Sequence, residues 1–329
     1  MKRKMLSLIL TCTLISTLIQ TPHSDSEDLP PAINLNGVPA TLADVKYGSH
    51  ERNSLDVWLA DSDVPTPIVI FFHGGGFTGG DKSGVYKSEK IPRFLDAEVS
   101  FATINYRYMK YTDIRSVMTC LDDAKRSLQF IRSKANEWNL DKSRIGAYGN
   151  SAGAGISLWL SFQPEMSDPN HSDLILREST RLKVAGAFAT QATYDILKWP
   201  EILQIPAGSE LLLMFLSAHG LQNEFRDARR SQDTESPNKE LDSIRKNVDL
   251  LGLISSDDPP IYVSNGMRGG TPEGLGHLFH HPLHVVALKT RAEEVELEAV
   301  VYAEKLGIGP EKEKQETQVS FFLRHLTDK

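Results

Sequence analysis

The chain is poor in cysteine, and this excludes an architecture held together by disulfides. It has two cysteines in 329 residues, and Cys12 lies in an N-terminal apolar segment. Only Cys120 remains beyond that segment, so we expect no intrachain disulfide in the rest of the chain. Cysteine and histidine spacings typical of metal sites are absent outside one histidine-rich stretch treated below. A chain of this length can instead rely on a hydrophobic core for stability.

The sequence also lacks an excess of basic residues, internal repeats and low-complexity stretches. It carries 36 Lys and Arg against 43 Asp and Glu, a formal charge of −7. Residues 1–22 hold three positive charges (Lys2, Arg3 and Lys4) and no negative one, so without them the charge is −10. An acidic chain argues against nucleic acid and anionic membranes as partners.

The N-terminus has the pattern of a secretory signal peptide. A basic start, Met1–Lys4, precedes the uncharged and mostly apolar run from Met5 to Ile19. This run is short for a membrane-spanning helix. We therefore expect a signal peptide over residues 1–22 and a secreted or periplasmic protein without further membrane contact. The region around Ile19 is a poor cleavage site, so an uncleaved N-terminal anchor remains the alternative.

The remaining sequence predicts a flexible lead over residues 23–40 and one α/β domain over residues 41–329. Apolar runs rich in β-branched residues alternate with stretches of helical periodicity, which indicates a mainly parallel central sheet flanked by helices. Strands are expected at 45–48, 53–60, 68–72, 100–106, 144–148, 183–189, 261–264 and 298–302. Helices are expected at 113–138, 154–162, 282–295 and 315–326. Residues 196–250 are helical and mixed in charge, which suggests an inserted helical cap.

A Gly-x-Ser-x-Gly pattern stands between a predicted strand and a predicted helix. Gly149 to Gly153 follow the apolar run 144–148, and a helical stretch begins at Ala154. In this context the pattern indicates a nucleophile elbow, a sharp turn that exposes the serine hydroxyl at the edge of a sheet. Ser151 is thus the candidate nucleophile. A glycine-rich turn around a buried serine is the structural alternative.

A second motif, His73-Gly74-Gly75-Gly76, directly follows the buried strand 68–72, 78 residues before Ser151. Glycines let backbone N–H groups approach a developing oxyanion without interference from side chains. The N–H groups of Gly74 and Gly75, with that of Ala152, are expected to form an oxyanion hole. A glycine-rich surface loop is the structural alternative, and His73 is expected to structure the loop rather than to act as a base.

The combined motifs resemble the α/β-hydrolase superfamily, specifically the HGGG-type carboxylesterases and the feruloyl or acetyl-xylan esterase-like group. The resemblance is carried by segments 55–58, 70–77, 104–108, 122–132, 144–153 and 256–260 with the strand after them. It implies an α/β-hydrolase fold and ester hydrolysis through an acyl-enzyme on Ser151. The implied substrate is a small-molecule or carbohydrate ester, and no cofactor is implied.

The chain departs from that group where the other two members of a catalytic triad are expected. The acid normally follows the strand at 261–264, but the matching position is Gly269, or Leu278 if the alignment starts at Pro282. The histidine normally follows the last strand, and residues 303–309 contain none. His325 lies in the final predicted helix and is expected to face solvent.

Four histidines lie instead between the strand 261–264 and its following helix, namely His277, His280, His281 and His284. This connection leaves the edge of the sheet at which open α/β folds bind ligands. We expect any base to come from this group, with His281 and His284 as the candidates. Capping and packing are the structural alternatives. No carboxylate motif accompanies these histidines, so we expect no metal site. Asp257 and Asp258 precede the strand and are expected at its far end or as turn residues, which leaves them as weak candidates for the acid.

Two functions from different classes follow. The first is a serine hydrolase of carboxylic esters with a displaced or degenerate triad. The second is a catalytically impaired homologue that binds a ligand or glycan without turning it over. An intact Ser151 and glycine loop favour the hydrolase, and the missing acid and histidine favour the binding protein.

Overall fold

The computed structural model describes residues 38–110, 114–206, 208–218 and 239–327. Residues 1–22 and most of the expected lead over residues 23–40 lie outside these ranges, as do residues 219–238 of the expected cap. The signal peptide and the lead therefore stay predictions. Within the described part of the chain, no helix is long and apolar enough to cross a membrane.

Eight strands form one sheet in the described residues, in the order β1-β2-β4-β3-β5-β6-β7-β8. They are β1 (Leu42–Lys46), β2 (Ser54–Trp58), β3 (Thr66–Phe72), β4 (Ser100–Ile104), β5 (Leu140–Asn150), β6 (Val184–Phe188), β7 (Ile261–Ser264) and β8 (Ala299–Tyr302). The β1–β2 and β2–β4 pairs are antiparallel, and the remaining pairs are parallel. The expected strands are all present, as is the mainly parallel sheet.

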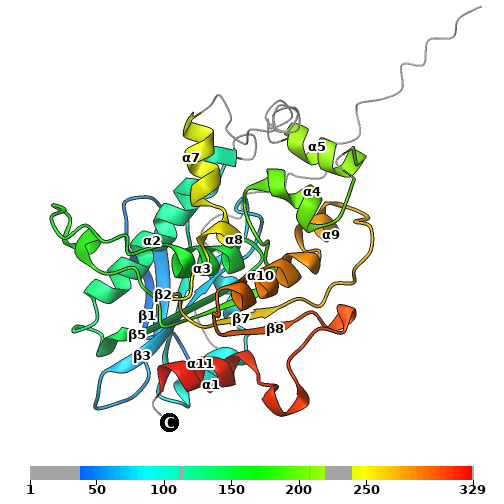
Figure 1. The fold of residues 1–329 in the computed structure, drawn as a ribbon. Helices are drawn as coiled ribbons and strands as arrows, with labels where there is room; N and C mark the ends of the chain where they lie inside the picture. The colour runs from blue at the N-terminus through cyan, green and yellow to red at the C-terminus, as the bar shows by residue number, and fades with distance from the viewer. Residues whose placement is uncertain (1–37, 111–113, 207, 219–238, 328–329) are drawn as a thin grey trace, which may run out of the picture. The chain divides into compact units, whose positions relative to one another are not determined.

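Helices cover both faces of the sheet (Figure 1). One face carries α2 (Val117–Ser133), α3 (Ala152–Phe162), α8 (Leu250–Leu253) and α10 (Leu283–Glu294), and the other carries α1 (Lys90–Leu95) and α11 (Gln318–Leu326). The two faces hold separate apolar clusters, one around Ile70 and Leu158 and the other around Phe101 and Phe322. Burial on both faces explains why β3 has no alternation and is apolar almost throughout.

The described part of residues 196–250 is helical, as expected for the cap. It contains α4 (Trp199–Ile202), α5 (Glu210–Ala218), α7 (Lys239–Asn247) and the beginning of α8. A third apolar cluster lies here, around Trp199, Leu212, Phe215 and Leu241. The short helix α9 (Leu275–Phe279), for which the sequence has no helical pattern, contributes Leu278 to this cluster. The cap and the histidine-rich connection therefore pack together.

Candidate active site

Ser151 stands between the end of β5 and the first residue of α3 and has a strained backbone, with φ 52° and ψ −117°. The two glycines of the motif explain how the turn closes. A Cβ atom at Gly149 would lie 2.2 Å from the carbonyl carbon of Gly153, and one at Gly153 would lie 2.0 Å from the carbonyl oxygen of Phe72. Only glycine fits at both positions, so the expected elbow geometry is present.

The hydroxyl of Ser151 contacts His280, with 2.8 Å between Oγ and Nε2. The other ring nitrogen of His280, Nδ1, lies 2.9 Å from the carbonyl oxygen of Gly276. A carbonyl oxygen can only accept a hydrogen bond, so Nδ1 carries the proton in the neutral ring. Nε2 is then an acceptor for the hydroxyl proton of Ser151, which is the arrangement that a general base requires.

Burial lowers the pKa of His280 below its ordinary value of 6.5, while the hydrogen bond to Gly276 acts in the opposite direction. Removing an imidazole from water disfavours its charged form. The ring is consequently neutral, and able to accept a proton, at neutral pH. Ser151 and His280 are both partly exposed, so the pair is open to solvent on one side.

The structure corrects the choice of His281 and His284 as candidate bases, because both rings are buried and bonded elsewhere. His281 Nε2 lies 2.8 Å from the carbonyl oxygen of Gly270, and its Nδ1 accepts from the N–H of Leu283 at 3.3 Å. His284 Nε2 lies 3.2 Å from the carbonyl oxygen of Leu278. Burial lowers the pKa of His284 to about 3. These rings turn into the fold as α10 begins, whereas His280 lies one residue past the end of α9.

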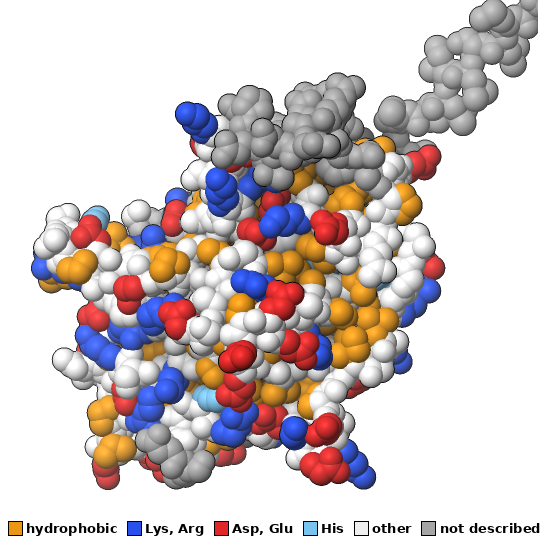
Figure 2. All heavy atoms as spheres, in the orientation of Figure 1, with side chains coloured by type: hydrophobic (Ala, Val, Ile, Leu, Met, Phe, Trp, Pro, Cys, Tyr) orange, Lys and Arg blue, Asp and Glu red, His pale blue; other side chains and the backbone are white. Residues whose placement is uncertain are grey.

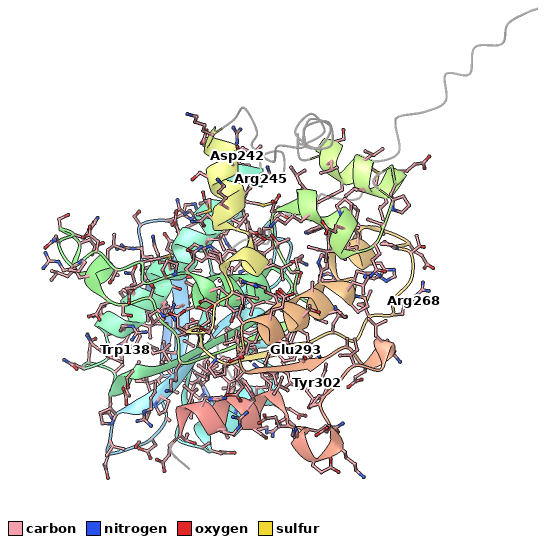
Figure 3. The ribbon with its side chains drawn as sticks, in the orientation of Figure 1. Trp138, Asp242, Arg245, Arg268, Glu293 and Tyr302 are labelled. Carbon is pink, nitrogen blue, oxygen red and sulfur yellow. The ribbon has the colours of Figure 1, made fainter. Side chains whose placement is uncertain are left out.

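The fourth histidine of the group, His277, also holds the chain rather than the serine. Its Nε2 lies 2.8 Å from the carbonyl oxygen of Arg268, which Figure 3 labels on the loop between β7 and α9. The rings of His277 and His281 stack with their centroids 5.2 Å apart. The same cluster of histidines thus supplies one contact to Ser151 and several supports for its own loop.

Neither of the two positions that align with the triad acid of the resembling group carries a carboxylate. Gly269 lies in the loop between β7 and α9, and Leu278 is fully buried in the cap cluster. Asp257 and Asp258 form a turn before β7, since both accept hydrogen bonds from Ser255. The backbone carbonyl of Gly276 therefore takes the place of a carboxylate at His280 Nδ1.

His325 differs from its expected position at the surface. Its side chain is only 14% exposed, lies 3.4 Å from a carboxylate oxygen of Glu298, and packs against the ring of Phe321. It belongs to α11, on the face of the sheet opposite α3. Nothing in this placement brings it near Ser151.

The glycine loop lies against the elbow. A Cβ atom at Gly74 would stand 2.9 Å from the carbonyl oxygen of Asn150 and 3.4 Å from Cβ of Ser151. Gly75 has a φ of +113° and leaves no room for a Cβ beside the carbonyl of Gly79. Ala152 is the first residue of α3, and the first N–H groups of a helix have no acceptor within the helix. These three residues thus come from two segments that meet at Ser151.

His73 structures this loop, as expected from the sequence. It is buried, its ring stacks on Tyr106 at 4.3 Å, and its Nδ1 lies 2.7 Å from the carbonyl oxygen of Gly74. Nδ1 must donate to that carbonyl, so Nε2 accepts from the guanidinium of Arg52 at 3.2 Å. Burial lowers the pKa of His73 to about 4. The same guanidinium donates to the carbonyl of Gly80, which fixes the far end of the loop.

Two further properties of the described residues concern metal binding and surface charge. No group of three or more His, Cys, Asp or Glu side chains among them could hold a metal ion. The face of the molecule in Figure 2 carries acidic and basic side chains interspersed.

Known proteins are similar to parts of this chain. A probable isoprenylcysteine alpha-carbonyl methylesterase of Arabidopsis thaliana is 26% identical over 160 residues, which cover 48% of this chain and 32% of that protein. The kynurenine formamidase of Danio rerio is 50% identical over 50 residues, 14% of this chain and 17% of that protein. The chain thus spans a third or less of the length of these relatives.

The fold has solved counterparts. A truncated carbohydrate esterase from gut microbiota superposes with a TM-score of 0.59 at 17% identity, covering 87% of this chain and 96% of that one. The likeness shows the α/β-hydrolase fold that the motifs implied. Residues 55–268 also match a protein family, BD-FAE. That region includes Ser151 and the glycine loop and ends before His280. Because the match spans more than half of the sequence, the chain belongs to the BD-FAE family.

Proposed function

We propose that the protein is a serine hydrolase of carboxylic esters that works with a Ser151–His280 pair and forms an acyl-enzyme on Ser151. The observation that carries the proposal is the 2.8 Å contact between Ser151 Oγ and His280 Nε2, with Nδ1 of the same ring held by a carbonyl. This is the geometry of a nucleophile beside an oriented base. Membership of the BD-FAE family and the esterase relatives support the same reaction.

The reaction begins when Ser151 Oγ attacks the carbonyl carbon of the ester while His280 Nε2 accepts the hydroxyl proton. The carbonyl oxygen becomes an oxyanion, and the N–H groups of Gly74, Gly75 and Ala152 donate to it. When the bond to the alcohol breaks, His280 Nε2–H returns the proton to the leaving oxygen. Water then attacks the acyl-enzyme with the same assistance, releasing the acid and restoring Ser151.

The carbonyl of Gly276 performs one part of the work of a triad carboxylate. It holds the ring in the tautomer whose Nε2 is free to accept a proton. A carbonyl dipole stabilises the imidazolium less than a full negative charge does, so the rate is expected to be lower than that of a complete triad. This division accounts for a functional base without an acid at Gly269 or at Leu278.

Hydrolysis of p-nitrophenyl acetate and labelling by a fluorophosphonate probe test the proposal. Ser151→Ala should abolish both, and His280→Gln should reduce both by about 10²- to 10⁴-fold, the usual contribution of a general base. His325→Gln, on the opposite face of the sheet, is the matched control and should retain full activity. If the wild-type protein neither hydrolyses the ester nor reacts with the probe, the protein is the binding homologue instead.

The substrate is proposed to be a small-molecule or carbohydrate ester. Support comes from the gut-microbiota structural counterpart, which is described as a carbohydrate esterase. Release of acetate from acetylated xylan, compared with hydrolysis of p-nitrophenyl acetate, separates the two substrate types.

We also propose export directed by residues 1–22. The test is N-terminal sequencing of protein recovered from outside the cytoplasm. A sequence that begins at Met1 would contradict cleavage of the signal peptide.

A further inference from the structure

Two buried side-chain amides hold the segment that carries His280. Gln191 Nε2 donates to the carbonyl oxygen of Phe279 at 2.7 Å, and Asn265 Nδ2 donates to the carbonyl oxygen of His280 at 3.0 Å. Gln191 lies in the connection after β6, and Asn265 directly follows β7. Their residues are only 6% and 3% exposed. The backbone carbonyls of Phe279 and of the base His280 are therefore held by residues that follow two different strands, β6 and β7.

Asn265 is itself held by hydrogen bonds from both its backbone and its side chain. Its backbone N–H donates to the carbonyl of Tyr302 in β8 at 2.8 Å, and its Oδ1 accepts from the N–H of Met267 at 2.7 Å. A buried amide whose N–H and oxygen are both hydrogen-bonded is held in one position, because any other position leaves these polar groups unpaired. Through Asn265, the carbonyl of His280 is thus held in a fixed position relative to the sheet.

These bonds lie where the chain would otherwise be loosely held. Helix α9 ends at Phe279, and the last carbonyls of a helix have no acceptor role within it. In a triad the carboxylate contacts the imidazole directly and sets its direction. Here Nδ1 of the ring is held by the backbone carbonyl of Gly276. The direction of the ring therefore also depends on where the backbone at residues 279 and 280 is held.

We infer that Gln191 and Asn265 are positioning residues that keep His280 Nε2 on Ser151, and this inference rests on the function proposed above. The two amides supply from the sheet the fixed orientation that a triad carboxylate would supply at the ring. Their side-chain amides bond to backbone carbonyls rather than to Ser151 Oγ or His280 Nε2, so they act through the position of His280.

Gln191→Met tests this, because methionine keeps the length of the side chain and removes the donor. We expect kcat for p-nitrophenyl acetate to fall about 10- to 100-fold, as misplacement of a reacting group by about 1 Å does. KM should change less than about threefold, since the lost bond is to the carbonyl of Phe279 and its expected effect is on the orientation of the base. Gln163→Met is the matched control. Gln163 is equally buried and donates to the carbonyl of Asn247 at 2.9 Å, but it follows the far end of α3 from Ser151.

A double-mutant cycle separates positioning from general support of the fold. In a His280→Gln background, Gln191→Met should cause no further loss, because the group through which it acts is gone. Equal loss in both backgrounds would overturn the inference. Asn265→Leu provides a second variant with the same expected pattern if Gln191→Met does not fold.

Nuclear magnetic resonance of the histidine rings distinguishes failure of this inference from failure of the proposed function. The Nδ1 resonance of His280, assigned by its disappearance in His280→Gln, should shift in Gln191→Met and stay in place in Gln163→Met. That shift supports positioning even in a protein without esterase activity. An unchanged resonance together with unchanged kcat would refute it.

Discussion

The contact between α3 and β3 at Gly153 makes a single added methyl group a test of the elbow. A Cβ atom at this position would lie 2.0 Å from the carbonyl oxygen of Phe72, 2.5 Å from its carbonyl carbon and 2.6 Å from the carbonyl oxygen of His73. All three atoms are backbone, so no side chain can move aside. To reach 3.0 Å, the lower limit of real contacts, α3 and β3 must separate by about 1 Å.

That separation changes the site as well as the packing. Ser151 precedes α3 and the glycine loop follows β3, so the two move apart together with these elements. We expect Gly153→Ala to lower kcat/KM for p-nitrophenyl acetate about 100-fold, the usual effect of a 1 Å displacement at a reacting centre. The free energy of unfolding should fall by about 1–3 kcal/mol, as for an overpacked core.

The assay pairs initial rates with urea unfolding, and Gly84→Ala serves as the control. A Cβ atom at Gly84 meets no atom within 4 Å, and this residue lies in the short turn of helix at Lys82–Val85. The control should therefore keep full activity and lose less than about 0.5 kcal/mol of stability. Full kcat/KM together with an unchanged unfolding midpoint in Gly153→Ala would show that the elbow does not need the close approach.

Two further predictions concern pH. Activity requires neutral His280, whose pKa is lowered by burial, so the rate should be full above pH 6.5 and fall only as pH drops through a midpoint below 6.5. A midpoint above 6.5 in the pH profile of kcat/KM would contradict this assignment. Stability should also fall with acid, because the pKa values of His73 and His284 are lowered to about 4 and about 3, so the unfolded chain binds protons first as pH falls below 6.5. Each of these two rings should remove about 2 kcal/mol of unfolding free energy between pH 7 and pH 5. His284→Leu should lose its share of this dependence in urea unfolding at the two pH values, and an unaltered dependence would refute the reasoning.

The parts of the site that the sequence predicted are those encoded by local motifs. Ser151 and the glycine loop each lie in a few consecutive residues whose geometry follows from glycine content and from a buried strand on one side. Their meeting across β3 and β5 follows from the parallel sheet, which the alternation of strands and helices indicates. The elements themselves were predictable for the same reason, since their apolar periodicity is strong.

The base could not be chosen from the sequence, because the choice depends on tertiary contacts. The four histidines lie within eight positions and are chemically equivalent until the fold separates them. The end of α9, a helix of five residues, leaves His280 partly exposed beside Ser151 and turns His281 inward. No sequence periodicity identifies so short a helix. The support from Gln191 and Asn265 was equally hidden, since it joins residues far apart in the chain.

The placement of the base also links it to the cap. Phe279, the residue before His280, contacts the rings of Trp199 and Phe215 in the cap with centroids 6.0 and 5.1 Å apart. Leu278 and His284 pack against the same region. The cap and the segment that carries the base thus share one apolar cluster. A change in the packing of the cap must therefore also change the position of His280.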